Sequence, residues 1–98
     1  MELHIDTAEF GRVNFVLEGR NKKISKTFAV IPQESDKILE SLEKFLKFAK
    51  IENLKSEIKK IIVYKKKTGS FTGLRIGAAI AQALSLAWGV SVNMRHKQ

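Results

Sequence analysis

Few side chains in this sequence could carry out chemistry. Asp6 follows a short apolar segment, in a position where a two-metal nuclease would place one of its carboxylates. Such a site needs several carboxylates that converge on the metal ions. The apolar segment 61–64 is instead followed by three lysines, residues 65–67, which contribute positive charge. The sequence therefore predicts that Asp6 caps the turn at Thr7 and does not serve in catalysis.

The two histidines, His4 and His96, lie far apart and do not form the helical pair that zinc peptidases use. Each is predicted to be a strand or surface residue. No cysteine is present, which excludes disulfides, thiolate catalysis and cysteine-ligated zinc. The sequence thus predicts no catalytic residue, no metal site and no cofactor.

Three glycines, Gly69, Gly73 and Gly77, recur every four residues. This spacing matches neither the dinucleotide-binding nor the P-loop pattern, and no lysine occupies the position that a P-loop requires. The start of the helix that follows could hold an anion, as any exposed helix N-terminus could. Nucleotide binding therefore gains no support from these glycines.

A strongly apolar helix is predicted to begin near Thr72, with Ser70 or Thr72 as its N-cap. Small residues recur along it and form a ridge that another backbone can approach: Gly73, Gly77, Ala81 and Ser85. The first helix of the same chain or a partner protein could occupy that ridge. The other side chains of this helix are apolar in nearly every direction, so the helix is predicted to be buried on more than one side.

The run Gly-Ser-Phe-Thr-Gly-Leu-Arg-Ile-Gly, residues 69–77, precedes an alanine-rich helix. It resembles the signature of the TsaB (YeaZ) family, the non-catalytic partners of TsaD in tRNA threonylcarbamoyladenosine synthesis. The resemblance extends more weakly to residues 5–7 and 90–92. Members of that family are longer than this sequence, so residues 1–98 are predicted to be a single TsaB-like N-terminal lobe without the family's second lobe.

The resemblance implies a cytoplasmic scaffold subunit that is not an enzyme. Its partner would be a TsaD-like transferase that holds the metal and the nucleotide, with a TsaE-like ATPase as a further partner and tRNA contacted indirectly. Whether the chain forms a homodimer or a heterodimer is left open. The partner interface is predicted to comprise Ile38, Leu42, Phe45, Phe48, Ser70, Phe71, Thr72, Gly73, Ile76, Gly77, Ile80, Ala81 and Leu84.

The formal net charge of +8 allows a different function. Lysines gather at residues 22–26, 59–60 and 65–67, and they could attract an RNA backbone by counterion release. A small basic RNA-binding protein that acts on tRNA directly is therefore the alternative. The sequence lacks a basic stripe interleaved with aromatic residues of the kind that stacks bases, so these lysines are also consistent with a solvated surface.

The remaining segments predict one α/β domain. Residues 3–7, 12–17 and 23–31 should form an antiparallel meander that ends at Pro32. Ser35 is expected to cap a helix that continues to about Lys50, and its apolar side covers about half of the helix circumference. The continuous apolar run 61–64 should be a strand buried on both faces. With a last strand over 89–93, the order is βββαβαβ, that of a ribonuclease-H-like lobe of actin-like and sugar-kinase-like proteins.

A membrane span is the alternative for residues 76–94, which contain no formal charge. Their length is adequate for a bilayer. Polar residues interrupt the stretch, however, and Gly89 followed by two valines favours a helix end and then a strand. The sequence therefore predicts a protein without a membrane segment.

Overall fold

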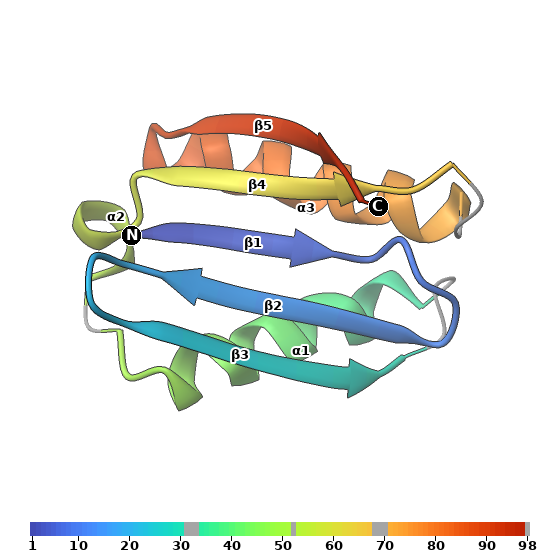
Figure 1. The fold of residues 1–98 in the computed structure, drawn as a ribbon, viewed down its shortest axis with the longest axis horizontal. Coiled ribbons are helices and arrows are strands. Elements are labelled where there is room, and N and C mark those ends of the chain that lie inside the picture. Colours follow the sequence, from blue (N-terminus) through green and yellow to red (C-terminus); the bar gives the residue numbers. More distant parts are fainter. Residues whose placement is uncertain (31–33, 52, 68–70, 98) are drawn as a thin grey trace.

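The computed structural model describes residues 1–30, 34–51, 53–67 and 71–97. Its centre is a five-stranded mixed sheet with the strand order β3-β2-β1-β4-β5 (Figure 1). Strands β1 (Glu2–Asp6), β2 (Arg12–Glu18) and β3 (Lys23–Ala29) form the predicted antiparallel meander. Strands β4 (Lys60–Lys65) and β5 (Ser91–His96) continue the sheet in parallel with β1.

The alternating sequence of β2 gives the sheet one buried face and one more exposed face. Val13, Phe15 and Leu17 are buried, whereas the residues between them are more exposed. The register places Leu17 opposite Leu3 and Phe15 opposite Ile5, so the apolar side chains of β1 and β2 share one face. That face must be covered, and the connections after β3 and β4 supply the two helices that cover it.

Helices α1 (Ser35–Phe48) and α3 (Phe71–Trp88) lie on this same face of the sheet. Figure 1 shows α1 behind the meander and α3 behind β4 and β5. A short helix, α2 (Leu54–Glu57), stands at the end of the sheet near the N-terminus, where the Met1 amino group donates a hydrogen bond to the Glu57 carbonyl at 2.8 Å. The element order confirms the predicted βββαβαβ arrangement.

The core fills the space between the sheet and the two helices. Phe15 of β2 and Phe45 of α1 stack at its centre, with their ring centroids 5.7 Å apart. The buried apolar residues come from β1, β2, α1, β4, α3 and the connections between elements: Leu3, Ile5, Val13, Phe15, Leu17, Val30, Ile38, Leu42, Phe45, Ala49, Ile58, Ile61, Val63 and Ala81.

Strand β4 is buried on both faces, as its continuous apolar sequence predicts. Ile61 and Val63 belong to the core, and Ile62, which points to the opposite face, is also fully buried. Ile62 lies beside His4 of β1. Within the described residues, no helix covers this opposite face (Figure 1), and the register places His4 and Asn93 on the two sides of Ile62.

The helix ends differ from prediction by one or two residues. Glu34, not Ser35, occupies the N-cap position of α1, and it makes no side-chain capping hydrogen bond. Helix α1 ends at Phe48, and Lys50 then adopts a left-handed conformation with φ 57°. The predicted strand end at Pro32 and the predicted cap at Ser70 lie outside the described residues.

Gly89 ends α3, as predicted. Its φ of 66° lies in the left-handed region that favours glycine. The amides of Gly89 and Val90 both donate to the Ser85 carbonyl, at 2.9 and 3.2 Å, and the chain then enters β5. Residues 76–94 therefore divide between a helix and a strand, and no helix among the described residues has the length and apolar character to cross a membrane.

Candidate partner-binding surface on helices α1 and α3

The ridge of small residues on α3 faces the strand β1 of the same chain. The Thr7 hydroxyl, directly after β1, donates a hydrogen bond to the Gly73 carbonyl at 2.6 Å. A Cβ on Gly77 would overlap the Thr7 hydroxyl oxygen and lie 3.3 Å from the Cβ and Cγ2 atoms of Thr7. Ala81 is fully buried. The close approach indicated by the sequence therefore joins α3 to the sheet, and neither α1 nor a partner occupies this part of the ridge.

The predicted interface residues of α1 divide into two groups. Ile38, Leu42 and Phe45 are at most 2% exposed and pack in the core, so they are not available to a partner. The apolar residues of α1 cover about half of the helix circumference, so the sequence alone could not show which of them face the sheet. Phe48 remains 57% exposed at the end of α1, where the Lys26 ammonium lies 4.5 Å from its ring centroid.

The predicted interface residues of α3 that remain accessible follow a single stripe. Ile76, Ile80 and Leu84 are spaced by four residues and are only partly buried, although each packs against the core. Thr72 is exposed near the start of the same helix, and it lines a shallow depression of about 370 Å³ with Arg75, Ile76 and Ala79. Ser70 lies outside the described residues, and the structure describes only the helical backbone of Phe71.

A second apolar surface lies at the end of α1. Leu46 and Ile51 line a depression of about 220 Å³ between Glu43 and Lys47, and both pack on the edge of the core while remaining partly accessible. We call Leu46, Phe48, Ile51, Thr72, Ile76, Ile80 and Leu84 the helix surface. These accessible side chains on α1 and α3 carry the candidate interface.

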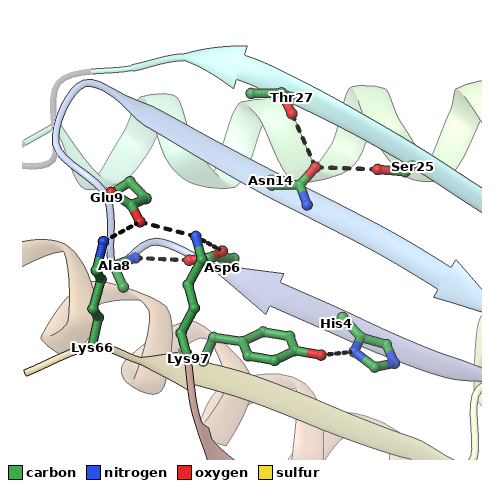
Figure 2. A network of polar contacts seen from close by, with 10 residues as sticks. His4, Asp6, Ala8, Glu9, Asn14, Ser25, Thr27, Lys66 and Lys97 are labelled. Carbon is green, nitrogen blue, oxygen red and sulfur yellow. Dashed lines mark hydrogen bonds and ion pairs between the residues drawn. The ribbon is translucent and has the colours of Figure 1, made fainter. Parts of the chain in front are cut away.

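The opposite face of the sheet bears a compact network of charges (Figure 2). The Lys97 ammonium lies 2.7 Å from Asp6 Oδ2 and 3.1 Å from Glu9 Oε1, and Lys66 lies 3.0 Å from the same Glu9 oxygen. The hydrogen bonds from Lys66 and Lys97 lower the pKa of Glu9 to about 2. Partial burial opposes the charge on Lys97, but the hydrogen bonds to Asp6 and Glu9 outweigh that effect and raise the pKa of Lys97.

This network explains the role of Asp6. Its Oδ1 atom accepts a hydrogen bond from the Ala8 amide at 3.1 Å, so Asp6 caps the turn after β1 as predicted. Two carboxylates and two ammonium groups balance one another here, and both acids are already engaged by lysines. The arrangement ties the end of β5 and the loop after β4 to the turn after β1.

The histidines occupy contrasting places. His96 is exposed at the end of β5, whereas His4 is buried in the central strand, where its Nδ1 atom lies 2.7 Å from the Tyr64 hydroxyl oxygen. The structure also brings Glu2 and Glu18 to the other side of His4, a grouping that the sequence reasoning missed. The signal available was the spacing of two between Glu2 and His4, which places both side chains on one face of a strand.

The strand order, the two helices on one face and the helix surface define a ribonuclease-H-like lobe with an apolar helical side. The chain belongs to the family described as TsaD: tRNA N6-adenosine threonylcarbamoyltransferase, whose model matches residues 13–94. No match is found among curated proteins.

Two solved structures share the fold across 97% of this chain. One is YeaZ from Pseudomonas aeruginosa, with a TM-score of 0.80 and 21% sequence identity. The other is an uncharacterized protein with similarity to peptidase YEAZ, also from Pseudomonas aeruginosa, with a TM-score of 0.81 and 21% identity. This chain spans 43% and 42% of their lengths. The resemblance to TsaB (YeaZ) is thus confirmed in the fold.

Proposed function

We propose that this chain is a non-catalytic scaffold subunit that binds a TsaD-like transferase during threonylcarbamoyl transfer to a tRNA adenosine. The observation that carries the proposal is the helix surface. Its stripe of Ile76, Ile80 and Leu84 runs along a helix that already buries its small-residue ridge on its own sheet. Helices with a second apolar side commonly pack against another element.

The match over residues 13–94 supports the pathway, because the family acts on tRNA adenosine. The family is named for the transferase itself, so the match does not support a non-catalytic role. The acidic residues of this chain support that part of the proposal. Asp6 ends β1 and Glu9 lies in the loop that follows, and lysine ammonium groups engage both acids. Carboxylates held in this way are poorly disposed to act as a general base or as ligands of two metal ions.

The test is binding to a purified TsaD-like transferase from the same source, measured by calorimetry. Ile80→Glu places a charge in the middle of the stripe, and we expect the affinity to fall about tenfold to a hundredfold, since about 1.4 kcal/mol corresponds to a factor of ten. Leu86→Glu is the matched control. Leu86 is on the same helix and is 86% exposed, but it lies outside the stripe, so its substitution should leave the affinity unchanged.

Thermal melting of each variant separates lost binding from lost folding. If Ile80→Glu and Leu86→Glu reduce the affinity equally and neither changes the melting temperature, the interface does not lie on the proposed stripe. A transfer assay completes the test: the chain should stimulate threonylcarbamoyl transfer by the transferase and have no transfer activity alone. Activity of the isolated chain, or tight salt-sensitive tRNA binding without the transferase, would refute the scaffold role.

A further inference from the structure

Glu2, His4 and Glu18 form a cluster of possible metal ligands on the face of the sheet opposite the helices. Glu2 and His4 are two residues apart on β1 and so share a face. Glu18 pairs directly with Glu2 across the β1–β2 ladder. One ligand atom from each of the three residues lies within 4.8 Å of the other two. The geometry follows from the hairpin register, so the backbone holds all three positions.

His4 gives this cluster a feature that ordinary surface acids lack. Its side chain is only 7% exposed, and Nε2 has no hydrogen-bond partner among the described residues. Buried polar atoms are nearly always hydrogen-bonded, and one that is not lowers the stability of the fold. Nε2 lies at an ion-pair distance of 3.3 Å from Glu2 Oε1 without hydrogen-bond geometry, so this nitrogen faces the carboxylate.

The other ring nitrogen of His4 is already engaged. Nδ1 lies 2.7 Å from the Tyr64 hydroxyl oxygen (Figure 2), and the two rings stack with centroids 5.6 Å apart. A metal-binding histidine commonly uses its second nitrogen in this way, because the hydrogen bond fixes the ring and its tautomer. When Nδ1 carries the proton, the Nε2 lone pair points toward two acids, an arrangement that a cation between them stabilises.

We propose that Glu2, His4 and Glu18 bind a divalent transition-metal ion, and that Zn²⁺ is the best match to this donor set. One imidazole and two carboxylates are common zinc ligands, and with a neutral ring they balance the charge of the ion. Ligands at about 2.1 Å from a tetrahedral zinc lie about 3.4 Å apart. Glu2 Oε1 is already 3.3 Å from Nε2, and since the three ligand atoms lie within 4.8 Å of one another, Glu18 needs to move inward by roughly an ångström.

The surroundings allow that movement. The side chains of Glu2 and Glu18 are 38% and 46% exposed, and rotation of either brings an oxygen toward His4. Glu18 has a competing contact with Lys23 at 3.9 Å, an exposed ion pair of the kind that contributes about 0 to 1 kcal/mol. With three protein ligands and open solvent on one side, the ion would keep a water molecule in its fourth position.

The test uses the tag-free chain, first treated with a chelator, and ZnCl₂ as the only added metal. Calorimetry should show one Zn²⁺ per chain, and the melting temperature should rise with zinc concentration because the ion binds the folded state. The ¹⁵N resonance of His4 Nε2 should shift on zinc addition. Absence of zinc binding, or binding without a change at His4, overturns the proposal.

Variants locate the site. Glu18→Gln keeps size and exposure and should weaken zinc binding about tenfold or more, and His4→Phe should abolish it while keeping the ring stacked on Tyr64. His96→Gln and Glu9→Gln are controls that remove the other histidine and an acid outside the cluster, and neither should change the affinity. If His4→Phe fails to fold, Glu2→Gln, a substitution at a half-buried position, replaces it. Unchanged zinc affinity in Glu18→Gln, or its loss in His96→Gln, refutes the assignment.

Discussion

Replacement of Gly77 by alanine tests the contact that joins α3 to the sheet. The added Cβ overlaps the Thr7 hydroxyl oxygen and lies 3.3 Å from two further Thr7 atoms. Thr7 is β-branched and buried, and its hydroxyl is held by the Gly73 carbonyl. The side chain therefore cannot move aside without losing that hydrogen bond.

The expected free-energy change combines three effects. Overpacking costs about 1 to 3 kcal/mol, and loss of the Thr7 hydrogen bond costs about 1 kcal/mol. The higher helix propensity of alanine stabilises the fold by about 1 kcal/mol and offsets part of these costs. Gly77→Ala should therefore destabilise the fold by about 1 to 3 kcal/mol, which for a domain of this size lowers the melting temperature by about 5 to 20 °C.

Urea denaturation of a double-mutant cycle provides the measurement. In a Thr7→Ala background the overlapping hydroxyl oxygen and Cγ2 are gone and only Cβ stays close, at 3.3 Å, so Gly77→Ala should become neutral or stabilising by up to about 1 kcal/mol. Ala83→Gly, at an exposed position of the same helix, measures the propensity effect alone. A Gly77→Ala protein as stable as the parent would refute the close contact, and an equal cost in both backgrounds would show that Thr7 is not its cause.

Two further predictions concern the charge network and the accessible apolar surface. Because the pKa of Glu9 is lowered to about 2, its stabilising effect is complete above the unfolded-state value of about 4.3 and is lost as the pH falls toward 2. Glu9→Gln should flatten this part of the stability profile in acid-denaturation curves, and an unchanged profile would contradict the network. The isolated chain should also self-associate, since Phe48 of the helix surface and Leu39, another residue of α1, are both exposed. Light scattering that shows only monomer at high concentration would contradict that expectation.

The strands and helices were largely predictable because their signals are local. The apolar run 61–64, the alternation in β2 and the glycine at 89 each reflect a single element. The last strand was predicted over 89–93 but spans Ser91–His96. Its start moves because Gly89 and Val90 still donate to Ser85 and complete the end of α3.

The orientation of the helices was less predictable. A stripe of small residues shows that something approaches closely, but it does not identify what approaches, and here Thr7 occupies that place. The grouping of Glu2, His4 and Glu18 depends on the hairpin register and on the burial of His4 beneath its neighbours. Neither follows from spacing along the sequence alone. Burial in the core removes three of the predicted α1 residues from the accessible surface, and the partner interface itself stays a prediction.

The central position of β1 has a consequence for the order in which the protein folds. Its antiparallel partner β2 follows within a few residues, whereas its parallel partner β4 comes only after β3 and α1. Local pairings form quickly and distant ones pay a larger loop-closure entropy. During synthesis, the meander can therefore assemble while one edge of β1 is still unpaired and the apolar side chains of Leu3 and Ile5 lack part of the core that later packs around them. Until β4 arrives, that edge of β1 is open to pairing with another strand, so slowed elongation between residues 30 and 60 would favour aggregation.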